Sequence, residues 1–225
     1  MVKGDSNLDQ DVSIPTVDGS LSGRLVVPAE PVGLMLFAHG SGSSRRSPRN
    51  LAVAERLHAA RLATLLFDLL FAAEEGNRRN VFDVPLLAGR LVAATRWATA
   101  SARVAALPLG YFGASTGAAA ALWAATEIGP QVRAVVSRGG RADLAGPVLD
   151  RVTAATMLIV GGADSAVLAV NQQAQRLLRC ENRLVVVPGA GHLFEERGAL
   201  DTVADLAAAW FVEHFVPRAL GGQSP

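Results

Sequence analysis

The sequence has one cysteine, one lysine and no long apolar run, and each scarcity excludes a class of protein. The lone Cys180 rules out an intrachain disulfide and fits a reducing compartment, so we expect a cytoplasmic protein. No apolar stretch approaches the roughly 18 residues that span a bilayer, and residues 1–10 are polar. We therefore expect neither a membrane segment nor a secretory signal. Lysine plus arginine (21) nearly cancels aspartate plus glutamate (20), which removes a general attraction to nucleic acid or anionic membranes.

The chain is poor in lysine but rich in apolar residues and arginine. Lys3 is the only lysine among many arginines, which is typical of a GC-rich bacterial genome. Hydrophobic residues make up 50% of the 225 positions, enough for one sizeable core. We expect a single domain over residues 1–225, with its core at about 12–216 and flexible ends at 1–11 and 218–225. A monomer or a homodimer is expected.

Short apolar runs alternate with helical stretches along the chain. Val12–Val17 and Leu21–Val27, linked by Asp18-Gly19, predict a β-hairpin. Six further apolar runs, each without alternation, predict buried parallel strands at 34–38, 64–67, 107–112, 134–136, 157–160 and 184–187. Helices are expected between them, at about 50–61, 81–100, 118–126, 166–178 and 200–215. The pattern predicts an α/β fold with an eight-stranded, mostly parallel sheet, an antiparallel N-terminal edge and helices on both faces.

Residues 110–117 read Gly-Tyr-Phe-Gly-Ala-Ser-Thr-Gly and carry the most specific motif in the chain. An apolar strand ends there, and an alanine-rich helix follows at once. This is G-x-S-x-G between a strand and a helix, the pattern of a nucleophile elbow. In such a turn, Gly113 and Gly117 leave room for tight packing while the Ser115 hydroxyl projects from the sheet. The same residues also suit an ordinary strand–helix turn, so the motif needs partners elsewhere.

Two further polar residues follow predicted strands, in the order that the elbow requires. Asp164 comes after Leu158–Val160, and His192 comes after the strand that ends at Val187. Parallel strands end at one edge of a sheet, so the three side chains should converge there. A serine hydroxyl needs a base, and the base needs a carboxylate to orient it. We assign these roles to His192 and Asp164, while Asp143 remains a competing acid and Asp164 alternatively a helix cap.

The loop after the third predicted strand, His39-Gly40-Ser41-Gly42, suits a second task in the same chemistry. Acyl transfer places negative charge on a carbonyl oxygen, which two backbone N–H groups can stabilise. We nominate the N–H groups of Thr116 and Ser41, with His39 bracing the loop. The loop also resembles a dinucleotide-binding turn that leads to Asp68. However, Arg45 stands where the third glycine belongs, and that interpretation leaves Ser115 and His192 without a role.

Taken together, these motifs resemble the α/β-hydrolase superfamily, and most of all its small dienelactone-hydrolase-like members. The resemblance extends from about Val12 to Phe215. It implies a Ser115–His192–Asp164 triad, an oxyanion hole formed by Thr116 and Ser41, and no metal or cofactor. True dienelactone hydrolases typically use cysteine as the nucleophile, and this chain has serine. The departure favours an ordinary carboxylic ester or thioester as substrate.

The rest of the sequence bears on the substrate. Only about 20 residues, at 137–156, separate two predicted strands after the elbow, which leaves room for one short helix near 144–152 and no large cap domain. Arginines collect in loops at the predicted active edge, so the small-molecule substrate is expected to carry an anionic group. Candidate substrate-binding residues are His39, Gly40, Arg45 and Arg138. Alternatively these arginines are solvated charges paired with acidic neighbours. A related acyltransferase, perhydrolase or C–C hydrolase, or a non-catalytic binding module, would share these motifs.

Overall fold

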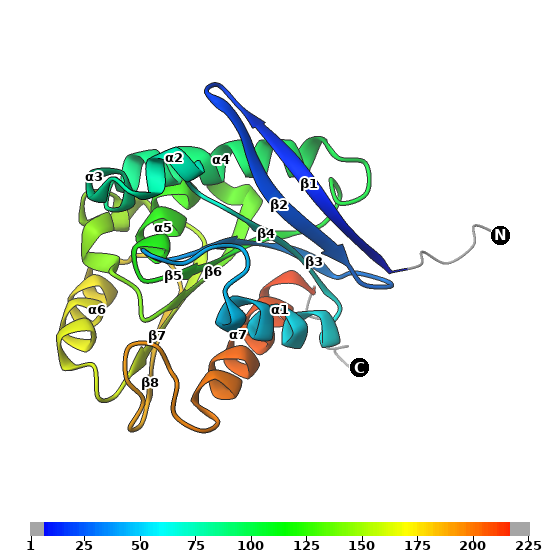
Figure 1. Ribbon diagram of the computed structural model, residues 1–225. Helices are drawn as coiled ribbons and strands as arrows, with labels where there is room; N and C mark the ends of the chain where they lie inside the picture. The colour runs from blue at the N-terminus through cyan, green and yellow to red at the C-terminus, as the bar shows by residue number, and fades with distance from the viewer. Residues whose placement is uncertain (1–6, 217–225) are drawn as a thin grey trace, which may run out of the picture.

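A computed structural model describes residues 7–216, which form one mixed sheet flanked by helices (Figure 1). The described strands lie in the order β1-β2-β4-β3-β5-β6-β7-β8. Strands β1 and β2 are antiparallel to their neighbours, and the rest run parallel. Their bounds are β1 Leu8–Thr16, β2 Gly19–Val27, β3 Gly33–Ala38, β4 Leu62–Phe67, β5 Leu109–Ala114, β6 Val132–Arg138, β7 Ala155–Gly161 and β8 Asn182–Val187.

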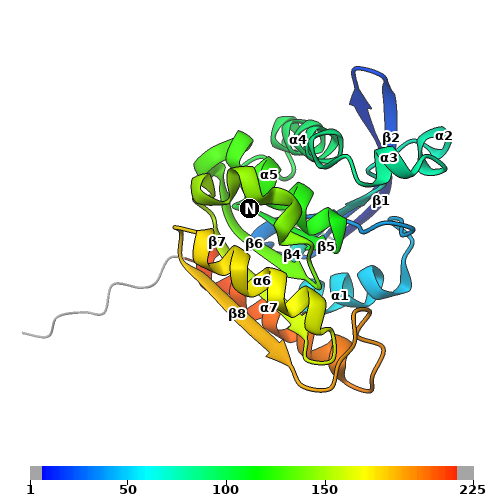
Figure 2. The same cartoon turned by 90° about the vertical axis from the view of Figure 1, so that its left-hand side faces the viewer.

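Helices cover both faces of the sheet (Figures 1 and 2). One face carries α1 (Pro48–Ala59) and α7 (Ala199–Phe215), and the other carries α4 (Val84–Ala100), α5 (Thr116–Ile128) and α6 (Ser165–Leu177). A hydrophobic core lies on each side, and every residue of β3, β4 and β5 is buried between the two. Burial on both faces explains why these strands are apolar without alternation. The predicted α/β-hydrolase fold is confirmed.

Several boundaries differ from the prediction for local reasons. The first strand begins at Leu8 rather than Val12, so residues 8–11 pair with β2 instead of forming a flexible end. The long helix begins at Val84 rather than near Val81, because the Asp83 side chain accepts the Leu86 N–H and caps it. Two short helices, α2 (Ala72–Glu75) and α3 (Arg78–Val81), were not expected. The ends expected to be flexible at 1–6 and 218–225 lie outside the described residues.

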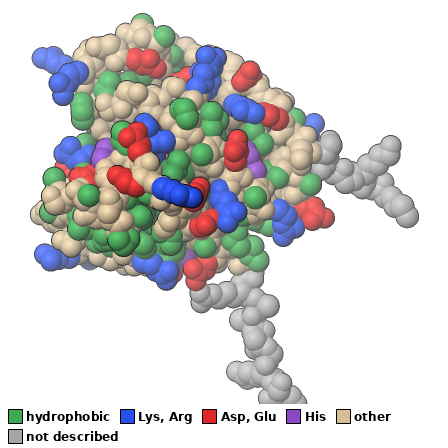
Figure 3. Space-filling view, turned by 60° about the horizontal axis from the view of Figure 1, so that its bottom comes forward, with side chains coloured by type: hydrophobic (Ala, Val, Ile, Leu, Met, Phe, Trp, Pro, Cys, Tyr) green, Lys and Arg blue, Asp and Glu red, His purple; other side chains and the backbone are tan. Residues whose placement is uncertain are grey.

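The connection between β6 and β7 is short, as expected, but is not an α-helix. A 3-10 helix, η2 (Ala142–Arg151), contains Pro147, which cannot donate the backbone hydrogen bond of a continuing α-helix. A second 3-10 turn, η1 (Gly129–Gln131), precedes β6. The space-filling view shows acidic and basic side chains interspersed on one face (Figure 3). Across the described residues, no helix is both long and apolar enough to cross a bilayer.

Candidate active site

Ser115 stands at the point where β5 turns into α5, with a backbone geometry that few residues adopt. Its φ is 49° and its ψ is −120°. The turn is tight because the flanking glycines contact neighbouring backbone directly. A Cβ on Gly117 would lie 2.1 Å from the Ala38 carbonyl oxygen, and one on Gly113 would lie 2.4 Å from Ala118 Cα. No other residue fits either position without a backbone shift, so this turn is the elbow that the motif predicts.

His192 and Asp164 form a hydrogen-bonded pair beside this elbow. Asp164 follows β7 and caps α6, and its Oδ1 accepts the Val167 N–H at 3.3 Å. Its Oδ2 lies 2.7 Å from Nδ1 of His192. Because a carboxylate only accepts, the proton lies on Nδ1 and leaves Nε2 as the acceptor in the neutral imidazole. This is the tautomer that a general base requires.

Asp143, the competing acid, is engaged elsewhere. Both of its carboxylate oxygens accept hydrogen bonds from Arg141, at 2.8 and 2.7 Å. The hydrogen bond from Arg141 holds the pKa of Asp143 below its usual value. A carboxylate that is held in this way is not available to orient His192, so the geometry favours Asp164.

One cavity of about 510 Å³ brings the three predicted catalytic residues together. Ser115, His192 and Asp164 all line it, with Ser41 and Thr116 beside them. Within residues 7–216, no hydrogen bond joins the Ser115 hydroxyl to the imidazole. Catalytic hydrogen bonds often form only when substrate is bound, so this arrangement is compatible with the predicted triad.

The two nominated oxyanion donors contact each other. The Ser41 N–H donates to Thr116 Oγ1 at 3.1 Å, and Thr116 is buried. Gly40 lets the loop approach the nucleophile, because a Cβ there would lie 2.9 Å from Ser115 Cβ. A carbonyl oxygen bound at Ser41 would therefore have to share its N–H with the threonine hydroxyl or displace that hydroxyl.

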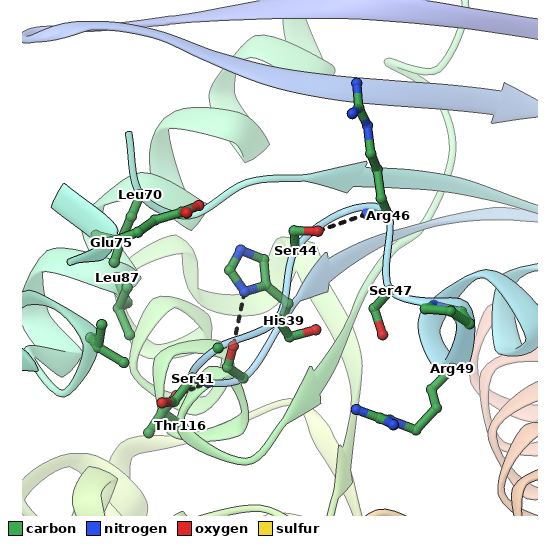
Figure 4. A pocket seen from close by; sticks show the side chains of 15 residues that line it. His39, Ser41, Ser44, Arg46, Ser47, Arg49, Leu70, Glu75, Leu87 and Thr116 are labelled. Atoms are coloured by element: carbon green, nitrogen blue, oxygen red, sulfur yellow. Dashed lines mark hydrogen bonds between the residues drawn. The ribbon is translucent and has the colours of Figure 1, made fainter. Parts of the chain in front are cut away.

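A second cavity of about 540 Å³ adjoins the first and shares Ser41, Thr116 and Arg49 with it. Figure 4 shows Glu75 across this cavity from Arg49. The wall on that side comes from the segment of α2 and α3, which the sequence did not predict. The only signal was the long stretch, about 16 residues, between the end of β4 and the start of α4.

His39 braces the loop through both ring nitrogens, and it also lines the second cavity. Its Nε2 accepts the Leu69 N–H at 3.0 Å, and its Nδ1 lies 3.1 Å from the Gly40 carbonyl oxygen. Both bonds form only with a neutral ring protonated on Nδ1. Burial lowers the pKa of His39, which keeps the ring in this form.

The predicted arginines divide into two groups. Arg45 pairs with Asp68 through both backbone and side chain and lines neither cavity. Asp68, the acid to which the alternative dinucleotide-binding turn would lead, is thereby occupied by Arg45. Arg138 is buried and lines the same cavity as Ser115. Among the residues that the model describes, no group of three or more His, Cys, Asp or Glu side chains could hold a metal ion.

Comparison with known proteins shows which solved structures share this fold and which proteins are similar in sequence. The chain is similar to the crystal structure of a dienelactone hydrolase from Anabaena variabilis, at 51% identity, with a TM-score of 0.91 over 94% of this chain and 100% of that one. It also resembles Est1E from Butyrivibrio proteoclasticus, at 16% identity, with a TM-score of 0.77 over 91% of this chain and 98% of that one. The second likeness concerns the fold alone.

Among curated proteins, a Mycobacterium tuberculosis protein provisionally named a phosphoribosyl transferase is 56% identical over 206 residues. The match covers 92% of this chain but 46% of that protein, so the chain spans about half the length of the curated relatives it matches most strongly. More than half of that protein lies outside the match. No family model matches the chain.

Proposed function

The chain belongs to the dienelactone-hydrolase-like α/β-hydrolases, and on that premise we propose that it is a serine hydrolase of small carboxylic esters or thioesters. The observation that carries the proposal is the His192–Asp164 hydrogen bond of 2.7 Å in the cavity that Ser115 lines. A hydroxyl, an imidazole whose Nε2 can accept a proton and a carboxylate that orients this imidazole are the groups that acyl transfer needs.

The reaction would begin when Ser115 Oγ attacks the carbonyl carbon and its proton passes to Nε2 of His192. Negative charge on the carbonyl oxygen would be stabilised by the N–H groups of Thr116 and Ser41. Collapse of the tetrahedral intermediate breaks the bond to the leaving oxygen or sulfur, which takes the proton from His192. Asp164 stays ionised throughout and stabilises the imidazolium.

Water would then hydrolyse the acyl-enzyme, with His192 and the oxyanion hole in the same roles. His192 removes a proton from the water as its oxygen attacks the acyl carbon. The second intermediate collapses, the carboxylic acid leaves, and the proton returns to Ser115 Oγ. The enzyme is regenerated with no change in its protonation, so this chain's own residues balance every step.

Substrate size follows from the walls of the site. The β6–β7 connection holds only η2, so no helical cap covers the nucleophile from that side. The two adjoining cavities, of about 510 and 540 Å³, fall in the range that suits small molecules. A short acyl group with a compact leaving group therefore suits the site better than a polymer or a long lipid chain.

The test combines active-site labelling with turnover. Wild-type protein should react with a fluorophosphonate probe and hydrolyse short-chain p-nitrophenyl esters or acyl thioesters. Ser115→Ala should lose labelling and nearly all turnover, whereas Ser22→Ala, on an exposed part of β2, should keep both. Wild-type turnover in the Ser115→Ala variant would refute the mechanism. Absence of labelling and turnover in the wild type would favour a binding module instead.

A further inference from the structure

Arg138 is a buried, positively charged side chain that forms no ion pair with an acidic residue among residues 7–216. It ends β6, next to the nucleophile, and the Ser115 N–H donates to its carbonyl oxygen at 3.3 Å. The residue is only 8% exposed, and its Nε and Nη1 are buried without a hydrogen-bond partner. Within residues 7–216, no carboxylate oxygen lies within 4 Å of its guanidinium nitrogens. Almost all buried charges in folded proteins are paired, so this exception needs an explanation.

The neighbouring charges make the exception sharper. Burial lowers the pKa of Arg138, and the positive charge of Arg49 lowers it further. Together these two causes bring the pKa of Arg138 to about 10. Arg138 therefore remains charged at neutral pH. The Arg49 Nε is also buried without a partner, although its Nη1 lies 3.3 Å from Glu195 Oε1. Two guanidinium groups thus face a region that lacks enough negative charge to balance them.

The nearby carboxylates cannot supply that balance. Asp143 is held by Arg141 through two hydrogen bonds, and Asp164 is held by His192. Arg45, which the sequence grouped with Arg138, is neutralised by Asp68. Of the arginines proposed as substrate-binding residues, only Arg138 combines burial, guanidinium nitrogens without a partner among residues 7–216 and a place in the lining of the cavity that holds Ser115.

We propose that Arg138, supported by Arg49, binds an anionic group of the substrate, a carboxylate or a phosphoryl group, while the scissile carbonyl lies at Ser115. The inference rests on the proposed function, which supplies the scissile bond. A guanidinium edge presents two parallel N–H donors that match two oxygens of either anion. Val136 contributes to the core beneath α1 and α7. Arg138, two residues further along the strand, lies on the same face, where Arg49 stands in the first turn of α1.

The placement also limits the distance between the anion and the reacting carbonyl. Ala114 and Arg138 are register partners on adjacent parallel strands. Neighbouring strands lie about 4.8 Å apart, so the backbone positions that carry the Ser115 and Arg138 side chains are close together at this edge of the sheet. A substrate that reaches both needs its anionic group only a few bonds from the ester carbonyl. The site therefore selects small, charged esters over neutral esters of equal size.

The experiment compares matched esters that differ in charge. Phenyl acetate is neutral, and 4-acetoxybenzoate and 4-acetoxyphenyl phosphate add a carboxylate or a phosphoryl group to the leaving group. A second pair, p-nitrophenyl butyrate and mono-p-nitrophenyl succinate, places the charge on the acyl side. For wild type, kcat/KM should be at least about 10-fold higher for one or more anionic esters than for its neutral partner. Equal values in all pairs would overturn the proposal.

Substitutions test whether the preference for anionic esters comes from the Arg138 side chain. Arg138→Met keeps the length of the stem and removes the charge, so kcat/KM for the preferred anionic ester should fall about 10- to 100-fold, with less than about 3-fold change for the neutral one. Arg133→Met, at an exposed position of the same strand, should change neither. An equal loss on neutral and anionic esters in Arg138→Met would show a structural role and refute the subsite.

A binding measurement separates this proposal from the proposed function. Glutarate or inorganic phosphate, at constant ionic strength, should raise the Tm of wild type and of Ser115→Ala, but not that of Arg138→Met. If no ester is cleaved and no probe labels Ser115, this shift still tests the anion site on its own. A shift of equal size in Arg138→Met, or none in wild type, would refute it. Arg138→Met itself should fold at least as stably as wild type, since it removes an unpaired buried charge.

Discussion

The substitution Asp164→Asn tests the proposed triad at its most specific contact. In wild type, Oδ2 accepts from His192 Nδ1 at 2.7 Å, and Oδ1 accepts the Val167 N–H at 3.3 Å. An asparagine has only one acceptor oxygen, so it cannot serve both donors. If the oxygen stays with Val167 and caps α6, the amide NH₂ faces His192 and favours the proton on Nε2. That tautomer cannot accept the proton of Ser115.

The expected magnitude follows from this loss of the acceptor nitrogen. We expect kcat to fall about 10⁴-fold, the effect seen when a triad carboxylate becomes an amide. The free energy of unfolding should change by less than about 1 kcal/mol, because asparagine caps a helix about as well as aspartate. Steady-state hydrolysis of a p-nitrophenyl ester measures the first quantity, and urea unfolding measures the second.

The matched control is Asp143→Asn, the same chemical change at the rival acid. Asp143 bonds Arg141 rather than His192, so its loss should reduce kcat by less than about 3-fold. If Asp143→Asn proves far more damaging than Asp164→Asn, the assignment of the acid is wrong. If Asp164→Asn retains a tenth of wild-type kcat, the tautomer argument itself fails.

Three other outcomes follow from the structure. Ser115→Gly should raise the free energy of unfolding by about 1 kcal/mol in urea titrations, because glycine tolerates φ 49° and ψ −120°; a less stable variant would contradict the strained elbow. Gly117→Ala should lower it by about 2 kcal/mol or more, since the new Cβ would meet the Ala38 carbonyl oxygen at 2.1 Å; an unchanged midpoint would count against the close approach. Burial lowers the pKa values of His39 and His58 in the folded protein. Below about pH 6.5 these histidines are protonated in the unfolded chain but stay neutral in the folded one, so the free energy of unfolding should fall as the pH falls. Urea titrations at pH 7.5 and 5.5 measure this, and equal stabilities would mean that neither ring is buried in its neutral form.

The sheet and the catalytic edge could be predicted because their signals are local. Buried parallel strands are apolar on both faces, and polar residues directly after them must lie at one edge. This logic placed Ser115, Asp164 and His192 in one cavity without any knowledge of side-chain contacts. The first residues of β1 were missed for a related reason. Asp9 and Asp11 make this edge strand look like a polar terminus, although Asp9 pairs with Arg24 across the hairpin.

The rest of the site depends on tertiary neighbours. Helices α2 and α3 have four residues each, too few for a helical period to appear in the sequence. Sequence alone could not tell which arginine would be neutralised. Arg45 meets Asp68, which follows a different strand, whereas Arg138 forms no ion pair with an acid in the part of the chain that the structure describes. The contact between Ser41 and Thr116 joins residues 75 positions apart and has no sequence signature.

Two energetic costs converge at the carboxyl ends of the central strands. Ser115 holds a disfavoured backbone geometry, and Arg138 buries a charge without a partner among residues 7–216. A fold under selection for stability alone would remove such features, since an apolar residue at 138 and a relaxed turn at 115 would each be more favourable. Their occurrence at one edge, around one cavity, is what binding and catalysis require. Relieving the strain at 115 or the charge at 138 should therefore raise stability and remove, respectively, turnover and anion preference.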